Sequence, residues 1–519
     1  LGFSFDGANY RGFAGDSLAS ALLANGIHFV GRSFKYHRPR GIFAAGFEEP
    51  NALVQLGEDP RTDPNQLATL VELVDGLSAR SQNRWPSLDY DVGALNNLAS
   101  RVFPSGFYYK TFMWPAAMWM KYEHFIRQAA GMGQSPRERD PDRYDKTYAH
   151  CDVLVVGAGP AGLAAALAAG RTGARVILAE QDHLLGGALL GEAEATVDGA
   201  PALDWARAAE AELRGLPEVQ VLERTTVYGY FDHNFLTLIE KVSDHLSRKP
   251  ERLPRHRLWK VRAKQVVLAT GSIERPLVFR DNDRPGIMLA GACRTYVNRY
   301  AAKPGTTAVV FTNNDSAYGA ALDLHAAGVE IAAIVDLRRE VIGPMSETAE
   351  AAGLPILADH AIVSTEGGRR IKRVRAAPMD PSGAGVYVSG EPIDCDLLAV
   401  SGGWSPTLHL HSQAKGEIAW NEEVGCFVPD RAKQAAQSAG ACNGAFGLAS
   451  CLAEGAAAGQ KAAAAAGFKA KRRKKAAPKA ADDGFLPARW LWLVPSDTPL
   501  GHGGKHFHEL QNDVTAADL

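Results

Sequence analysis

The apolar positions of this chain fall into short runs that alternate with longer alanine-rich segments. Val153–Val156 and Arg175–Ala179 have the pattern of buried strands, and the segment between them has a helical composition. Gln265–Gly271 is a third strand-like run, ending in Ala-Thr-Gly. Thr307–Phe311 and Ile331–Val335 repeat the order of strand, helix and strand. This alternation predicts an α/β fold with two strand–helix–strand domains, and the glycine-rich turn Gly157–Gly162 after the first strand indicates a Rossmann-like, FAD/NAD(P)-binding fold.

The first strand–helix–strand unit carries a glycine-rich turn, Gly157-Ala158-Gly159-Pro160-Ala161-Gly162. Gly157 would permit the tight turn, Gly159 would let the backbone approach a pyrophosphate, and Gly162 would let helix and strand pack closely. The phosphates would meet free N–H groups at the positive end of the helix dipole. Glu180 ends the second strand and is placed to accept hydrogen bonds from an adenosine ribose. These features together predict a dinucleotide site rather than an alanine-rich packing helix.

Three later segments add candidate contacts to the same site. Gly187 and Ala188 can form a second backbone approach to the nucleotide, and the backbone of Val227 can receive an adenine edge. Thr270 and Gly271 belong to the Ala-Thr-Gly turn. In flavoproteins with two dinucleotide folds, this turn precedes the second domain.

The second strand–helix–strand unit has lost most of its glycine pattern. Its turn, Thr312–Gly319, keeps one glycine at the end. Asp315 would place a negative charge where a pyrophosphate should lie. We therefore expect the fold to be retained there and nucleotide binding to be lost.

The N-terminal region predicts a small β-grasp module. Asp16–Gly26 is a helical segment that Asp16 or Ser17 can cap and Gly26 can end, and Ala52–Leu56 is strand-like. Plant-type ferredoxins of this shape hold a [2Fe–2S] cluster through C-x4-C-x2-C. The corresponding loop, Ile42–Ala52, contains no cysteine. The module is therefore interpreted as structural.

These patterns divide the chain into seven parts. The β-grasp module takes residues 1–60, and a helical, aromatic connector takes 61–149. The first dinucleotide domain takes 150–275 and, after the degenerate second domain at 276–405, returns at 406–467. A basic linker at 468–483 leads to a tail at 484–519.

Composition excludes several other classes of protein. A net charge of −2 argues against nucleic acid or a membrane surface as the main partner. The longest apolar candidate, Phe107–Met120, is interrupted by Lys110 and Pro115, so no membrane span is expected. The six cysteines form no C-x-x-C pair and the tail histidines match no zinc pattern, so no metal site is predicted. The scattered cysteines also indicate a reducing, cytoplasmic setting. Because the chain starts at Leu1, a fragment is expected.

The identity of the nucleotide depends on the turn Ala439–Cys442. Flavoproteins with two dinucleotide folds place an Asp here to bond the FAD ribityl chain, and Ala441 stands in its place. A charge-assisted hydrogen bond is worth ~1.5–3 kcal/mol. Its loss weakens the flavin half of the site, which favours NAD and leaves FAD as the alternative. No catalytic base, nucleophile or redox pair stands out, which suggests one component of a larger assembly.

Several longer strings identify a family resemblance. The chain resembles the α subunit of heterotetrameric sarcosine oxidase. The strings that carry the resemblance are Gly31–Gly41, Gly106–Pro115, Tyr148–Gly157, Gly291–Tyr300 and Leu510–Thr515.

The resemblance implies a concrete activity for the complex. Sarcosine would be oxidised to glycine, with release of hydrogen peroxide and of the methyl carbon as formaldehyde or to tetrahydrofolate. FAD would act on the β subunit, FMN would lie at the α/β boundary, and the α subunit would carry NAD. Smaller γ and δ subunits would complete the heterotetramer. The family's folate-binding half would lie beyond these residues.

The family's NAD contacts carry over onto nine positions of this sequence. They are Ala161, Glu180, Gln181, Asp182, Ala188, Val227, Ala441, Phe446 and Leu448. The run Glu180–Asp182 departs from the more familiar acidic-acidic-basic strand end. Two other interpretations stay open: the FAD-binding subunit of a related amine or opine oxidase or cyanide-forming dehydrogenase, and a non-catalytic scaffold.

Overall fold

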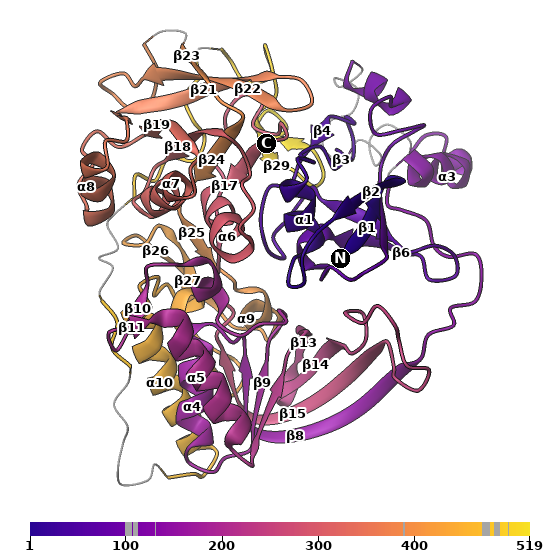
Figure 1. The fold of residues 1–519 in the computed structure, drawn as a ribbon, viewed down its shortest axis with the longest axis vertical. Coiled ribbons are helices and arrows are strands. Elements are labelled where there is room, and N and C mark those ends of the chain that lie inside the picture. Colours follow the sequence, from indigo (N-terminus) through magenta and orange to yellow (C-terminus); the bar gives the residue numbers. More distant parts are fainter. Residues whose placement is uncertain are drawn as a thin grey trace. The chain divides into compact units, whose positions relative to one another are not determined.

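A computed structural model divides the chain into two compact units, each built from separate stretches of sequence (Figure 1). Unit 1 contains Leu1–Pro141, Arg275–Gly403 and Arg489–Leu519, and unit 2 contains Asp142–Glu274 and Trp404–Ala488. The structure describes all residues except 99–105, 107–112, 130, 388–389, 470–477, 482–487 and 497. Most of the Gly106–Pro115 string and of the predicted basic linker therefore lies outside the described residues.

Unit 2 is built on a seven-stranded sheet. Its central strands are parallel because helices connect them, and β13 and β14 extend the sheet as an antiparallel ribbon. The return strand β28 pairs in parallel with the end of β15, as the sequence predicts for the chain's return to the first domain. The strands are β8 (Tyr144–Val156), β9 (Val176–Ala179), β12 (Val219–Leu222), β13 (Thr225–Phe231), β14 (Phe235–Lys241), β15 (His256–Leu268) and β28 (Ala436–Ser438).

Helices cover one face of this sheet. Val153 and Val155 pack with the apolar side chains of α4, α5 and α10, whereas Leu154 and Val156 face the opposite core, where Leu410 of α9 packs. This division follows from the two-residue period of a strand. The helices are α4 (Pro160–Gly170), α5 (Ala202–Gly215), α9 (His409–Gln413) and α10 (Leu448–Ala465).

Helix α10 approaches α4 at backbone distance. A Cβ atom built on Gly455 would lie 2.1 Å from the carbonyl oxygen of Ala161, and one built on Gly459 would lie 2.1 Å from that of Ala165. Both positions therefore require glycine. Helix α10 lies in the stretch 406–467, where the sequence predicts a return to the first dinucleotide domain.

Unit 2 is completed by short pairs of strands. They are β10 (Thr196–Val197) with β11 (Ala200–Pro201), β16 (Ser272–Glu274) with β25 (Trp404–Pro406), and β26 (Ile418–Asn421) with β27 (Cys426–Pro429).

Unit 1 contains the second dinucleotide fold. Its sheet of five parallel strands runs β17–β24–β18–β19–β20, which confirms the predicted second strand–helix–strand unit. The elements are β17 (Ile287–Leu289), α6 (Ala290–Tyr300), β18 (Thr307–Thr312), α7 (Ser316–Ala326), β19 (Glu330–Asp336), α8 (Pro344–Ala351), β20 (Ile356–Ala358) and β24 (Leu397–Ser401). A separate three-stranded sheet joins β21 (His360–Gly367), β22 (Ile371–Pro378) and β23 (Glu391–Asp394).

The N-terminal module forms a five-stranded sheet with one helix. Ser17 caps α1 through a reciprocal capping box with Ser20, as one of the two predicted caps. The sheet continues past the boundary predicted at residue 60, because β7 pairs in parallel with β1. The elements are β1 (Gly2–Phe5), β2 (Ala8–Arg11), α1 (Leu18–Ala24), β5 (Leu53–Leu56), β6 (Asp63–Leu67) and β7 (Leu77–Ser81). α3 (Trp119–Ala129) lies further along in the predicted connector.

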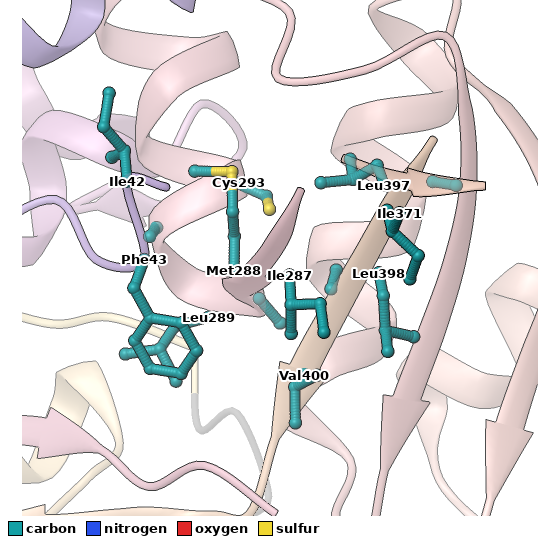
Figure 2. Packing of buried hydrophobic residues seen from close by; sticks show 14 of the residues in the cluster. Ile42, Phe43, Ile287, Met288, Leu289, Cys293, Ile371, Leu397, Leu398 and Val400 are labelled. Carbon is teal, nitrogen blue, oxygen red and sulfur yellow. The ribbon is translucent and has the colours of Figure 1, made fainter. Parts of the chain in front are cut away.

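The module and the second fold share one hydrophobic core within unit 1. Figure 2 shows Ile42 and Phe43 of the module beside Met288, Leu289 and Cys293. The backbone N–H of Leu289 donates to the carbonyl oxygen of Phe43 at 2.8 Å. The module is therefore packed as part of the unit.

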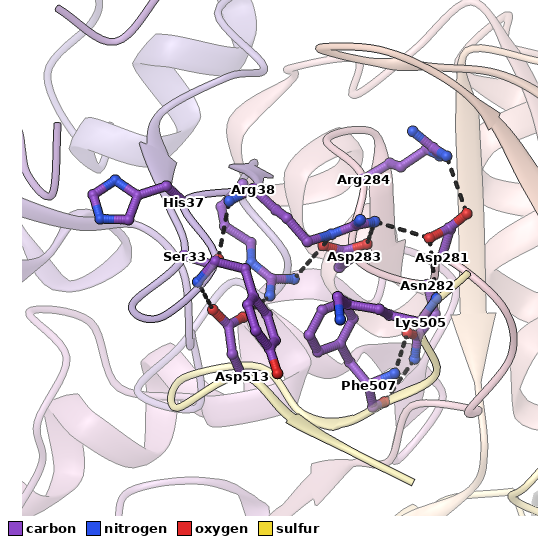
Figure 3. A network of polar contacts seen from close by, with 12 residues as sticks. Ser33, His37, Arg38, Asp281, Asn282, Asp283, Arg284, Lys505, Phe507 and Asp513 are labelled. Atoms are coloured by element: carbon purple, nitrogen blue, oxygen red, sulfur yellow. Dashed lines mark hydrogen bonds and ion pairs between the residues drawn. The ribbon is translucent and has the colours of Figure 1, made fainter. Parts of the chain in front are cut away.

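A buried network of charges joins three distant stretches of unit 1 (Figure 3). Arg40, 1% exposed, pairs with Asp283 at 3.1 Å and with Asp513. Asp513 also accepts hydrogen bonds from the backbone N–H groups of Lys35 and Tyr36. Two of the strings that carry the family resemblance, Gly31–Gly41 and Leu510–Thr515, therefore meet in space. The hairpins there are β3 (Gly31–Arg32) with β4 (Pro39–Arg40) and β29 (Phe507–Glu509) with β30 (Val514–Thr515).

Among the described residues, no helix is both long enough and apolar enough to cross a membrane.

Candidate nucleotide-binding site

The glycine-rich turn of unit 2 has the geometry that its sequence predicts. Gly157 follows β8 with φ +94°, and a Cβ there would lie 2.3 Å from the carbonyl oxygen of Ala269. Gly162 lies in the first turn of α4, where a Cβ would lie 1.8 Å from the carbonyl oxygen of Gly157. Neither position has space for a side chain. The close approach of backbone carbonyl groups at Gly157 and Gly162 therefore restricts both positions of the turn to glycine.

Gly159 differs from its two neighbours because the protein itself has space for a Cβ there. The nearest atom to that Cβ would be the Cα of Gly187, at 3.9 Å. Gly159 is the N-cap of α4 and Pro160 follows at its first position, so the first N–H groups of the helix have no partner within the helix. This is where a pyrophosphate would meet the backbone.

A second loop lies against the glycine turn. The N–H of Gly186 donates to the carbonyl oxygen of Ala158 at 2.9 Å, and Gly187 has φ +56°. Ala188 is exposed beside it. The structure thus brings Gly187 and Ala188 to the turn, as predicted for a second backbone approach.

Glu180 follows β9 and its carboxylate faces the glycine turn. It accepts hydrogen bonds from the N–H of Ala158 at 2.6 Å and from the N–H of Asp182 at 2.9 Å. Burial raises the pKa of Glu180, against the lowering effect of these N–H donors. Each carboxylate oxygen has a further lone pair for a ribose hydroxyl. Glu180 therefore orders the turn and keeps the capacity to bind ribose.

The residues after Glu180 lie beside β13. Thr225 begins this strand, and its N–H donates to the carbonyl oxygen of Glu180 at 2.7 Å. The N–H of Arg224 donates to the carbonyl oxygen of Asp182 at 2.9 Å. Gln181 contacts the hydroxyl of Thr226 at 3.5 Å. Val227, two residues into β13, is thus held near the Glu180–Asp182 corner.

Thr270 and Gly271 lie at the end of β15, where the chain leaves the first dinucleotide domain. The Thr270 hydroxyl donates to the carbonyl oxygen of Thr407 at 2.9 Å, and the N–H of Thr407 donates to the carbonyl oxygen of Gly271 at 2.9 Å. The outgoing and returning strands of the domain are joined here. This turn has a structural role in addition to any contact with a nucleotide.

Ala441 lies in a short 3-10 helix, η7 (Gly440–Asn443), that precedes α10. A Cβ on Gly440 would lie 2.6 Å from the Cβ of Ala161, so this turn lies directly over the start of α4. Leu448 is the first residue of α10 and is buried, and Phe446 is half-buried. The predicted distal set, Ala441, Phe446 and Leu448, therefore belongs to the segment that meets the glycine turn.

Sequence reasoning missed Glu454. Its carboxylate accepts hydrogen bonds from the N–H of Gly440 at 2.9 Å and from the side-chain amide of Asn443 at 3.2 Å. It therefore anchors the turn that carries Ala441 to helix α10. The signal was available, because Glu454 is an isolated carboxylate in an alanine-rich helix.

The second fold has a different arrangement at the same place. Asp336 ends β19, where Glu180 lies in the first fold, but it is already paired with Arg338 at 2.7 Å and with the hydroxyl of Tyr318 at 2.9 Å. Asp315 faces the same guanidinium at 3.5 Å. The acidic group that would bind ribose is thus committed within the protein.

A segment of the tail crosses the carboxyl ends of these strands. The N–H of Arg489 donates to the carbonyl oxygen of Asn313 at 2.9 Å, and its guanidinium donates to the carbonyl oxygen of Leu337. The indole N–H of Trp492 donates to the carbonyl oxygen of Gly402 at 2.8 Å. Ligands of open α/β sheets bind outside these strand ends. The tail therefore fills the place of a nucleotide in the second fold.

Comparison with protein families indicates the class of fold that this chain has. A family described as "2Fe-2S iron-sulfur cluster binding domain" matches residues 1–84, and one described as "FAD dependent oxidoreductase" matches residues 152–244. The solved structure of L-proline dehydrogenase from P. horikoshii aligns with a TM-score of 0.61 at 19% identity, covering 91% of this chain and 74% of that one. The chain thus has a ferredoxin-like module followed by the two-dinucleotide-domain fold of an oxidoreductase.

Sequence comparison is more specific. The chain is 46% identical to the sarcosine oxidase alpha subunit of Rhizobium meliloti and 39% identical to that of a Corynebacterium species, in each case over 100% of this chain. It spans about half the length of these curated relatives, 51% and 49%. An opine oxidase subunit of Agrobacterium tumefaciens is 28% identical over 54% of the chain. The resemblance to the α subunit of sarcosine oxidase is therefore confirmed along the entire chain.

Proposed function

We propose that this chain is the NAD-carrying part of the α subunit of a multi-subunit sarcosine oxidase. The observation that carries the proposal is the similarity, from end to end of the chain, to the sarcosine oxidase alpha subunit of Rhizobium meliloti. The geometry of unit 2 supports it, because Glu180 accepts a hydrogen bond from the glycine turn that begins α4, and together these groups would form a dinucleotide cradle. The residues that would hold the nucleotide are those predicted from the sequence.

The nucleotide is proposed to be NAD because the adenosine half of the site is better equipped than the other half. Glu180 supplies a carboxylate at the ribose position, and Gly159 leaves the pyrophosphate position open. Ala441 offers a methyl group where a flavin ribityl chain would need a carboxylate. This difference favours a nucleotide that does not depend on that contact.

Amine oxidation is proposed to take place on a partner β subunit that carries FAD, with FMN at the boundary between the two subunits. Sarcosine would be converted to glycine, with hydrogen peroxide and formaldehyde or methylene-tetrahydrofolate as the other products. Burial raises the pKa of Cys151, Cys395 and Cys451 to about 12, so these thiols stay protonated near neutral pH. This supports a chain that binds and positions rather than reacts. Smaller γ and δ subunits are proposed to complete the assembly.

A second candidate is a component of an amine or opine oxidase that holds FAD in the same cradle. The match of residues 152–244 to the FAD dependent oxidoreductase family favours it, as does the similarity to the opine oxidase subunit of Agrobacterium tumefaciens. The two candidates differ in the molecule that the chain retains.

Mass spectrometry of the small molecule released by denaturing the purified chain tests the proposal. We expect one equivalent of NAD per chain, because the tail fills the second fold. Stoichiometric FAD would contradict the proposal and support the second candidate. Co-purification with flavoprotein subunits, followed by an assay of peroxide release from a panel of amines, tests the partner and the substrate.

Gly159→Val tests the position of the nucleotide. Its side chain would enter the space left for the pyrophosphate, so we expect at least a tenfold loss of bound nucleotide in a chain that still folds. The matched control is Gly215→Val, whose Cβ would enter open space. Unchanged nucleotide content in the first variant would refute the placement.

A further inference from the structure

The loop of the N-terminal module at residues 42–52 is wrapped around one buried carboxylate. Glu49 is 3% exposed, and its two oxygens accept four backbone hydrogen bonds. One oxygen accepts from the N–H groups of Phe43 at 2.8 Å and Ala44 at 2.6 Å. The other accepts from those of Asn51 at 2.7 Å and Ala52 at 3.0 Å. A carboxylate has about four lone-pair directions, so Glu49 is saturated by its own loop.

The position of Glu49 in this loop matches a ligand position of a plant-type ferredoxin. Ala44, Glu49 and Ala52 have the spacing of C-x4-C-x2-C. Ala68 adds a fourth position and a third small residue, because its N–H donates to the carbonyl oxygen of Ala52 at 2.9 Å. Ala44, Ala52 and Ala68 are all fully buried.

A [2Fe–2S] cluster does not fit these residues. Such clusters are held by thiolates, and all six cysteines of the chain lie beyond residue 150. The alanines offer no ligand atom, and the one carboxylate already has four N–H partners. The module therefore keeps the fold of the matched 2Fe-2S family without its metal chemistry.

We propose that the Glu49 carboxylate takes the place of the iron–sulfur cluster and holds the loop in its cluster-binding shape without metal. An anionic cluster accepts hydrogen bonds from the surrounding backbone. If neither a cluster nor another acceptor were present, the inward N–H groups of the loop would be buried and unsatisfied, at a considerable cost in stability. Glu49 supplies the acceptors, and it also supplies a negative charge above the pKa of about 7 to which burial raises this carboxyl.

The outer side of the same loop shows what the shape is used for. The carbonyl oxygen of Phe43 accepts from the N–H of Leu289, and that of Ala44 accepts from the hydroxyl of Tyr296 at 2.9 Å. Ile42 and Phe43 pack into the core of the second dinucleotide fold (Figure 2). The loop therefore works as a docking element inside unit 1, and the module is a brace rather than an electron carrier.

Hydrogen exchange of the whole chain tests the role of Glu49. In Glu49→Gln the side-chain NH2 would face two of the four backbone donors, so exchange of peptides covering residues 42–52 should rise by about tenfold or more. The matched control is Glu58→Gln, which removes an exposed carboxylate paired with Arg80 in the same module. Equal exchange in Glu49→Gln and the unsubstituted chain would overturn the proposal, as would stoichiometric iron in the purified protein.

A graft of cysteines provides a second readout. The quadruple variant A44C/E49C/A52C/A68C, supplied with ferrous iron and sulfide, should acquire the visible absorption and the reduced-state electron paramagnetic resonance signal of a [2Fe–2S] cluster. The triple variant A44C/A52C/A68C, which keeps Glu49, should not. A cluster of equal occupancy in the triple variant, or none in the quadruple variant, would show that Glu49 does not stand at a ligand position.

Discussion

At the scale of single residues, carboxylates in this chain order loops by accepting backbone hydrogen bonds. Glu180 does so at the glycine turn, Glu454 at the turn that carries Ala441, and Glu49 in the N-terminal module. Glu180 and Glu454 each lie on a different segment from the turn that they fix. Glu49 lies within the loop that surrounds it. Such contacts satisfy buried N–H groups that regular secondary structure leaves unpaired.

Glu180→Gln is expected to weaken nucleotide binding by about tenfold or more, because hydrogen bonds to a charged acceptor are worth ~1.5–3 kcal/mol. The substitution keeps the shape of the side chain and removes its charge. Isothermal titration of the nucleotide-depleted chain would measure the change. Glu212→Gln, which removes only a partly exposed pair with Arg171, serves as the control. Equal affinity in the two variants would exclude a ribose contact for Glu180.

At the scale of elements, the N-terminal module and the second fold meet where His28 and Arg370 lie close together. Burial, followed by the charge of Arg370, lowers the pKa of His28 to about 4, and Asp396 opposes this shift. The folded chain therefore holds His28 neutral at pH values where the unfolded chain would protonate it.

This shift predicts an acid-sensitive junction. Stability from His28 is complete above its ordinary pKa near 6.5 and is lost as the pH falls toward 4, by at most about 3 kcal/mol. Thermal unfolding between pH 7 and pH 4 should show a smaller loss in His28→Gln than in the unsubstituted chain. His325→Gln, on an exposed position of α7, should leave the profile unchanged. Parallel profiles for His28→Gln and the unsubstituted chain would contradict this assignment.

Elements defined by local pattern were predictable from the sequence, and contacts between distant segments were not. The apolar runs predicted both dinucleotide folds, the glycine spacing supported the first of them, and the Ser17 cap followed from its neighbours. Nothing near Arg489 indicates that it meets Asn313, because that contact depends on the path of the tail. The boundary at residue 60 failed to include β7 for the same reason, since its partner β1 lies at the other end of the module.

At the scale of the whole molecule, each unit is assembled from separate stretches of the chain. Unit 2 is interrupted by the second fold, and unit 1 is interrupted by the first. The N-terminal module, the second fold and the tail meet at the buried network of charges formed by Arg40, Asp283 and Asp513 (Figure 3). A chain of this design gains its final contacts from residues that are far apart in sequence.

The close packing of Gly455 and Gly459 against α4 has a consequence for the order of events during protein synthesis. α4 begins at Pro160, whereas its partner α10 begins at Leu448. On the ribosome, on the order of tens of seconds therefore pass between the synthesis of α4 and that of α10. A nascent chain arrested before α10 is expected to retain none of the proposed nucleotide, whereas one released after Leu519 is expected to retain it. Measuring the nucleotide in such stalled chains would show whether cofactor loading is timed by translation.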